Sequence, residues 1–150
     1  MTAALVVVGE ATVDEIVELR RRVLRSGTPS AEPRLPEDDT PGAFHLAGRR
    51  DGEVVACVSF MPQDTPLHPG EPAWRFRAMA VDPSLQGSGF GRVILADGIE
   101  RLRALGVHVL WASARDTAIG FYESMGMHVE GDGYVDATTA LPHHAVIIDL

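Results

Sequence analysis

A glycine-rich segment in the middle of the chain restricts the fold most. Residues 81–92 read VDPSLQGSGFGR and lie between an extended apolar run, residues 74–81, and a helical pattern that continues to Gly106. This order predicts a strand, a tight turn and the start of a helix. Glycine at positions 87, 89 and 91 allows successive backbone N–H groups to approach an anion, and the positive end of the helix adds to the attraction. The segment therefore predicts a phosphate site that a pyrophosphate would fit.

Two well-known glycine motifs do not match this turn. The dinucleotide-binding pattern GxGxxG needs glycine at position 92 or 94, where the chain has Arg92 and Ile94. The triphosphate-binding pattern GxxxxGK, followed by Ser or Thr, needs a lysine, and the sequence has none. The spacing that remains is QxxGxG, from Gln86 to Gly91. A glycine-rich turn that holds no ligand is the alternative interpretation.

Composition narrows the class of protein. The chain has 150 residues, of which 45% are hydrophobic, and we expect a single domain over residues 1–150. A net charge of −8 argues against a nucleic-acid partner. Because no apolar run is long enough to cross a bilayer and no targeting segment is recognised, we expect a cytoplasmic protein without a membrane partner. Scattered histidines and one cysteine, Cys57 within an apolar run, predict no metal site and no internal disulfide.

The remaining sequence predicts a mixed α/β (α+β) domain. A capping-box spacing at Thr12 and Glu15 begins one helix, a second runs from Gly89 to Gly106, and a third begins at Asp116 or Thr117. The third helix ends near Met125. The helical crossover predicts that the strands before and after the second helix are parallel. Besides residues 74–81, the predicted strands are residues 3–8, 44–47, 54–60, 107–112, 127–134 and 145–150.

Two motifs in this order resemble those of one family. Val81 and Pro83 followed by QxxGxG resemble motif A of the GNAT superfamily of N-acetyltransferases. Residues 115–127, RDTAIGFYESMGM, are similar to the GNAT motif NxxAxxFYExxGF, although Arg115 replaces its asparagine and Met127 its closing phenylalanine. The predicted order β-α-β-β-β-α-β-α-β-β also resembles the whole GNAT fold. The resemblance implies a mixed sheet of six to seven strands flanked by helices, with parallel fourth and fifth strands splayed around the cofactor.

The resemblance implies acetyl-CoA as cosubstrate. In GNAT proteins the loop amides hold the pyrophosphate of coenzyme A, and the fourth strand accepts the pantetheine arm as if it were another strand. For Arg115, contact with the CoA phosphates and a solvated or ion-paired side chain are equal alternatives. Carried onto this chain, the cofactor-binding residues are Met79, Ala80, Val81, Gln86, Gly87, Ser88, Gly89, Phe90, Gly91, Arg92 and Arg115.

Acyl transfer from a thioester needs an uncharged amine, a polarised carbonyl and a proton for the departing thiolate. Tyr122 is similar to the GNAT tyrosine that supplies this proton; the alternative is a ring that packs under the cofactor and only orients the sulfur. The fourth predicted strand of this chain, residues 74–81, has no glutamate to act as general base. The candidates for a base that acts through a water molecule are Glu71, His45, His68 and His143. Each of them could instead be an ordinary solvated residue, and the amine could lose its proton to bulk water before it binds.

The implied function is transfer of acetyl from acetyl-CoA to a primary amine of an unidentified small molecule or peptide. A non-catalytic acetyl-CoA sensor is the alternative, and a longer acyl chain is a third reading. Alternation along the fourth strand predicts that Arg75, Arg77 and Met79 share a face, so the two arginines could bind an acceptor carboxylate. They could instead pair with Glu37, Asp38 or Glu71. The acidic run at residues 37–39 could attract a cationic amine or could be solvated. Dimers in the GNAT family often form through terminal strands, so the resemblance also implies a homodimer.

Overall fold

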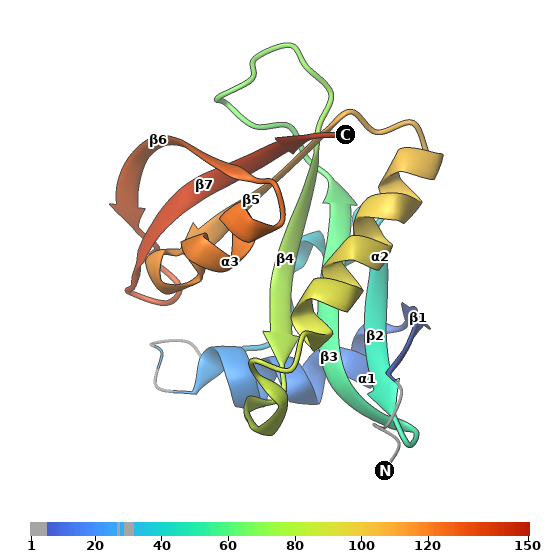
Figure 1. Cartoon of the computed structure of the whole chain (residues 1–150). Helices are drawn as coiled ribbons and strands as arrows, with labels where there is room; N and C mark the ends of the chain where they lie inside the picture. Colours follow the sequence, from blue (N-terminus) through green and yellow to red (C-terminus); the bar gives the residue numbers. More distant parts are fainter. Residues whose placement is uncertain (1–5, 27, 29–31) are drawn as a thin grey trace.

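A mixed seven-stranded sheet runs through the molecule (Figure 1). The computed structural model describes residues 6–26, 28 and 32–150. Within them the strand order is β1-β2-β3-β4-β5-β7-β6, in which β4 and β5 are parallel and all other neighbours antiparallel. This arrangement confirms the predicted sheet. The strands are β1 (Val7–Ala11), β2 (Phe44–Arg50), β3 (Glu53–Pro62), β4 (Trp74–Val81), β5 (Val109–Arg115), β6 (His128–Val135) and β7 (Pro142–Asp149).

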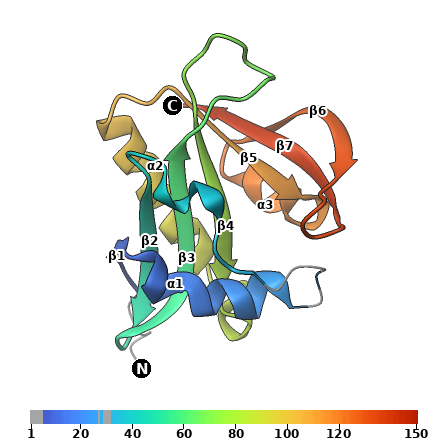
Figure 2. The same ribbon diagram turned by 180° about the vertical axis from the view of Figure 1, so that it is seen from behind.

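Helices cover both faces of the sheet. Figures 1 and 2 show α2 across β2–β4 on one face and α1 across the same strands on the other. The small helix α3 packs beside β6 and β7. In the described ranges, no helix combines the length and apolar character needed to span a membrane. The helical segments are α1 (Val13–Arg20), its π-helical continuation η1 (Arg21–Arg25), α2 (Phe90–Ala104), α3 (Ile119–Ser124) and the short 3-10 turns η2 (Pro36–Asp39), η3 (Pro83–Leu85) and η4 (Asp116–Ala118).

Several elements differ in length from their predicted bounds. In the hairpin, β2 continues to Arg50 and β3 already begins at Glu53. Backbone pairing continues up to the Asp51–Gly52 turn because it does not depend on side-chain polarity. The first strand extends past Gly9 to Ala11, since it is held in register by β2. Residues 3–5 of the predicted first strand lie outside the described residues. The predicted bounds of β4 are confirmed.

A buried ion pair joins α1 to the segment before β2. Arg20 is 1% exposed and makes two hydrogen bonds of 2.8 Å to the carboxylate of Asp38. It also donates to Ser59 Oγ at 2.6 Å, which in turn contacts His45 Nδ1 at 2.7 Å. The reading of residues 37–39 as a solvated run is wrong for Asp38, because the Arg20 guanidinium compensates its burial.

The apolar core on the α2 side fixes the position of that helix. Ile94, Leu95, Ile99 and Leu102 are buried against β2–β4 and belong to the same cluster as Phe60 and Phe76. At Gly98 the helix backbone comes so close to the Phe60 ring that an added Cβ would lie 2.1 Å from its Cζ atom. Because α2 is held this closely to β3, its N-terminus has a defined place beside the end of β4.

Candidate active site

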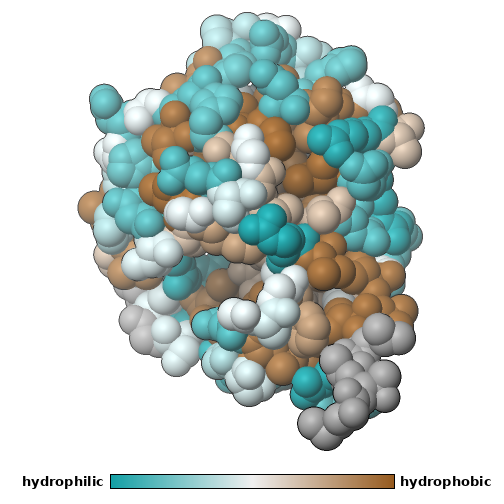
Figure 3. Space-filling view, viewed as in Figure 1, coloured by the Kyte–Doolittle hydropathy of each residue, from teal (hydrophilic) through white to brown (hydrophobic). Residues whose placement is uncertain are grey.

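The two parallel strands at the centre of the sheet separate soon after they pair. Among the described residues, β4 and β5 share register only at Trp74↔Leu110 and Arg75↔Trp111. Beyond these pairs the strands diverge (Figure 1), and a cavity of about 720 Å³ lies between them. Figure 3 shows the hollow on this face below α3. Unpaired strand edges present N–H and C=O groups to any extended partner, so β4 offers the cavity a backbone edge.

A bulge interrupts β4 where it borders the cavity. Two of its residues, Ala78 and Met79, stand between the register pairs Cys57↔Ala80 and Ser59↔Arg77, opposite the single residue Val58. Ala78 has φ 54, in the left-handed region that non-glycine residues seldom adopt. Such strain is often found where a strand serves a ligand site.

The bulge also reverses the side-chain alternation of β4. Arg77 forms an ion pair with Glu37 of η2 at 2.9 Å, on the side of the sheet that α1 covers. Met79 instead packs into the core cluster on the α2 side. The prediction that Arg75, Arg77 and Met79 share a face is therefore wrong, because one extra residue shifts the parity of the strand. The cavity therefore has two sides, one that carries the arginines of β4 and one that faces α2.

The glycine-rich loop supplies backbone donors to the α2 side. Two of its glycines, Gly87 and Gly89, have φ 84 and 91, which explains why side chains are disfavoured there. The first helical bond of α2 runs from Val93 N to Gly89 O at 3.1 Å, so earlier amides precede the helix ladder. Within the described chain no acceptor takes the amides of Gly87, Gly89, Phe90, Gly91 and Arg92, and all five residues line the cavity.

A missing side chain at Gly91 lets α2 begin close to β4. A Cβ at this position would lie 3.2 Å from Met79 Cε and 3.4 Å from Val81 Cγ2. This is a cradle that a larger residue would fill. The open amides, the bare helix start and the free edge of β4 fit a pyrophosphate followed by an extended amide-bearing arm.

The polar side chains of this loop stabilise its shape. Gln86 Nε2 donates to the carbonyl of Val81 at 3.2 Å, and Arg92 donates to Ser124 Oγ at 2.8 Å. The amide of Ser88 donates to Leu85 O at 3.1 Å, and its hydroxyl bonds the same carbonyl. Ten of the eleven predicted cofactor residues line the cavity, and Ser88 does not.

Tyr122, on α3, lines the cavity beside the bulge of β4. It is 9% exposed, its ring packs against Phe76 and Phe121, and its hydroxyl lies 3.8 Å from Met79 Sδ beside the bulge. Burial raises the pKa of Tyr122 to about 12, against a smaller lowering by Arg115. The hydroxyl therefore stays protonated at neutral pH and holds a proton at this position in the cavity.

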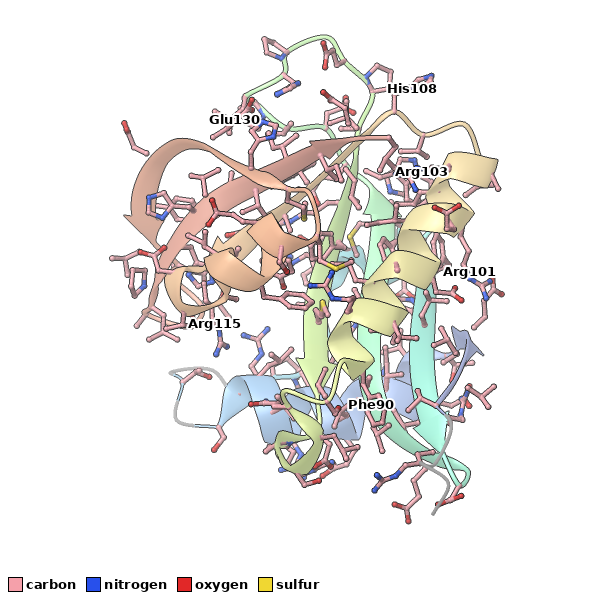
Figure 4. The ribbon with its side chains drawn as sticks, viewed as in Figure 1. Phe90, Arg101, Arg103, His108, Arg115 and Glu130 are labelled. Carbon is pink, nitrogen blue, oxygen red and sulfur yellow. The ribbon has the colours of Figure 1, made fainter. Side chains whose placement is uncertain are left out.

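Arg115 extends from the end of β5 toward α1. Its guanidinium donates to the carbonyl of Leu24, in η1, at 2.9 Å. Figure 4 shows this residue below α3, with its side chain directed toward η1 and away from the Phe90 end of α2. Arg115 thus lies on the cavity wall, away from the glycine-rich loop.

The predicted base candidates lie in three places. His68 and Glu71 bond each other at 2.9 Å on the loop before β4, and His45 is part of the buried Arg20 cluster; none of the three lines the cavity. His143 on β7 does line it. Its Nδ1 lies 2.9 Å from the carbonyl of Leu141, which can only accept, so Nδ1 carries the hydrogen; Nε2 has no hydrogen-bond partner among the described residues and is the acceptor of the neutral ring.

Part of the cavity wall carried no signal in the sequence. These residues come from η1, from β5, from the β6–β7 turn and from the position before η2, and no motif marks them as part of a cavity wall. Across the described chain, no three metal-ligating side chains gather. The unforeseen wall residues are Val23, Leu24, Arg25, Leu35, Ser113, Asp136, Thr138 and Thr139.

Comparison with known proteins identifies the family of this chain. Residues 13–127 match the Acetyltransferase (GNAT) family. The uncharacterized N-acetyltransferase YitI of Bacillus subtilis is 29% identical over 123 residues, covering 82% of this chain and 83% of YitI. A mycothiol acetyltransferase of Nocardiopsis dassonvillei is 35% identical over 91 residues, which are 57% of this chain but only 28% of that protein.

Solved structures agree in fold at low identity. Escherichia coli ElaA superposes with a TM-score of 0.77 at 18% identity, covering 95% of this chain and 99% of ElaA. FeeM, an N-acyl amino acid synthase from uncultured soil microbes, gives a TM-score of 0.80 at 14% identity, covering 98% of this chain and 92% of FeeM. With a family match that spans most of the sequence, the chain belongs to the GNAT acetyltransferase family and is an acyltransferase.

Proposed function

We propose that the protein transfers the acetyl group of acetyl-CoA to a primary amine by direct attack, without a covalent enzyme intermediate. The observation that carries this proposal is the set of five open amides at the start of α2 beside the free edge of β4. Acetyl-CoA supplies the activated acyl group. The family match and relatives named as N-acetyltransferases support the same donor and acceptor class.

The chain's own groups have separable roles in this proposal. Amides of Gly87 to Arg92 bind the pyrophosphate, and Met79, Ala80 and Val81 pair through their backbone with the pantetheine arm. An amide at the β4 bulge donates to the thioester oxygen and polarises the carbonyl. Tyr122 then donates its phenolic proton to the departing sulfur, a step typically worth roughly 10²- to 10⁴-fold in rate.

The amine must be uncharged before it attacks. His143 is the base candidate that geometry favours, because its Nε2 is free to accept a proton and its ring lines the cavity. Transfer to bulk water before binding is the alternative. Replacement of His143 by Gln separates them: a base role predicts a lost or shifted ascending limb of kcat/KM, whereas an unchanged pH profile assigns the limb to the amine.

Calorimetric titration with CoA, followed by thiol release from acetyl-CoA across an amine panel, tests the function. We expect saturable CoA binding and amine-dependent thiol release. Tyr122→Phe should lower kcat by about 10²-fold or more. A loss below about threefold would remove the proton-donor role. CoA binding without amine-dependent thiol release would favour the acetyl-CoA sensor.

Other expectations remain predictions. Cytoplasmic location, a homodimer formed through terminal strands and a single domain over residues 1–150 are not tested by the fold. The cofactor role of Arg115 is also a prediction, and its bond to Leu24 O is neither the solvated nor the ion-paired arrangement given as the alternative. The acyl-chain length accepted by the cavity follows from the same thiol-release assay run with longer acyl-CoA donors.

A further inference from the structure

We infer that the amine acceptor carries an oxyanion group, a carboxylate or a phosphate ester, which binds to Arg25, Arg75 and Arg77 on the α1 side of the cavity. This inference rests on the proposed acetyl transfer and names its acceptor class. It follows from three arginines, on two separate elements, that converge on the cavity wall opposite the glycine-rich loop.

Charge around the cavity is opposite to that of the whole protein. The chain has a net charge of −8, yet five arginines and one carboxylate, Asp136, line the cavity. Asp136 Oδ1 accepts the amides of Thr138 and Thr139 at 2.9 and 3.0 Å, and the arginines outnumber its single charge. A cavity with this lining attracts anions and repels a simple cationic amine.

In the described ranges Arg25 and Arg75 form no ion pair with a carboxylate, whereas Arg77 has one. Arg75 stacks over the Trp111 ring at 4.6 Å, and its buried Nε has no hydrogen-bond partner in the described chain. Within the same ranges, no carboxylate pairs with Arg25, and Arg77 has the single partner Glu37 at 2.9 Å. Stacking on an aromatic ring leaves the guanidinium edge free to donate, which is the geometry used for planar oxyanions.

Mutual repulsion supports this convergence. Burial, followed by the charge of Arg77, lowers the pKa of Arg75 to about 10, against smaller raising effects of Glu37 and Asp136. Burial likewise lowers the pKa of Arg25, followed by Arg77 and Arg115. The cations therefore lie close enough to destabilise one another, and a bound anion would relieve that repulsion.

The position of the arginines limits the size of the acceptor. Arg77 and Arg75 lie one and three residues before Ala78 at the bulge, which is roughly 3 and 10 Å along an extended strand. The arginine stems shorten or lengthen this span by their own reach. The acceptor must therefore place its oxyanion at these arginines and its amine at the bulge. A small compact molecule, or the terminal residue of a peptide, can do this.

These arginines are separated from the expected CoA phosphates by the sheet. The open amides and Gly91 lie at the start of α2, whereas Arg77 pairs with η2 on the face that α1 covers. An acceptor entering from the α1 side would meet the thioester from the face opposite the cofactor phosphates. Acceptor and donor would then occupy different mouths of one cavity.

Matched acceptors test the inference. Common L-amino acids are compared with their carboxamides, and phosphoethanolamine with ethanolamine, using thiol release from acetyl-CoA. We expect kcat/KM to favour the anionic member of a pair by about tenfold or more, the usual effect of a charge-assisted hydrogen bond. Whether carboxylate or phosphate amines show the preference identifies the group. In Arg75→Gln and Arg25→Gln this preference should fall toward one, whereas Arg103→Gln, on exposed α2 surface outside the cavity, should retain it.

A binding arm keeps the inference independent of turnover. Calorimetry of CoA-loaded protein with N-acetyl amino acids and their carboxamides should show tighter binding of the acids, lost in Arg75→Gln. If acids bind in this way but no amine is acetylated, the acceptor pocket stands and the proposed transfer fails. Equal use of neutral and anionic partners, no binding of either, or arginine variants that weaken CoA instead of the acceptor would overturn the inference.

Discussion

Replacing Gly98 by Ala tests how α2, the helix that begins at the phosphate loop, is held against the sheet. The new Cβ would lie 2.1 Å from Phe60 Cζ and 2.4 Å from Cε2. Non-bonded carbons rest about 3.5 to 4.0 Å apart, so helix or ring must move by more than about 1 Å. Phe60 is fully buried and stacks on Phe44 at 5.0 Å, which leaves the ring little freedom to move.

The magnitude follows from two opposing terms. Overpacking of a core typically costs about 1 to 3 kcal/mol, and this contact is severe enough to reach the upper end. Alanine in place of glycine within a helix recovers about 1 kcal/mol. We expect a net loss of about 2 kcal/mol in the free energy of unfolding. For a domain of this size that lowers Tm by roughly 4 to 8 °C.

Urea denaturation of four variants decides the question. Gly120→Ala is the matched control, because a Cβ there meets nothing within 4 Å. This control should be as stable as the natural sequence or slightly more so. In a Phe60→Leu background the cost of Gly98→Ala should shrink, since the ring that it strikes is gone. A Gly98→Ala variant as stable as the control, or a cost unchanged by Phe60→Leu, would refute the steric argument.

Three other predictions follow from the site and the buried cluster. Gly89→Ala should weaken CoA binding about tenfold, because alanine at φ 91 adds about 1 to 2 kcal/mol of backbone strain; an unchanged calorimetric Kd would contradict this. Because burial raises the pKa of Tyr122 to about 12, kcat should show no descending limb below about pH 10, and a limb there that Tyr122→Phe abolishes would be contrary evidence. Burial lowers the pKa of His45 from 6.5, so below that pH the unfolded chain binds a proton that the native ring does not. Stability should therefore fall on acidification by up to about 1.4 kcal/mol per pH unit, and urea titrations from pH 5 to 7 should show a shallower slope in His45→Gln.

The phosphate loop could be predicted because its signals are local. Gly87 and Gly89 have the positive φ that a turn of this kind needs, and Thr12 with Glu15 forms the expected capping box. Each depends on residues within a few positions of one another. The same reasoning placed β4 correctly and its parallel pairing with β5, because a helical crossover permits little else.

The bulge in β4 had no comparable signal. Ala78 occupies a left-handed conformation for which alanine has no preference, so alternation along the strand predicted the wrong face for Met79. Buried Arg20 was also unforeseen, because its compensation by Asp38 depends on a partner eighteen positions away. Neither feature is a property of the local sequence.

What the sequence alone determined is the set of elements and the backbone donors, since helix caps, glycine turns and apolar period act between near neighbours. The tertiary structure decided which charges meet. Arg25, Arg75 and Asp136 lie far apart along the chain and gather at one cavity only because β4 and β5 diverge and the bulge fixes the faces of β4. Long-range packing sets those distances, and electrostatic interactions depend on distance and burial rather than on order in the chain.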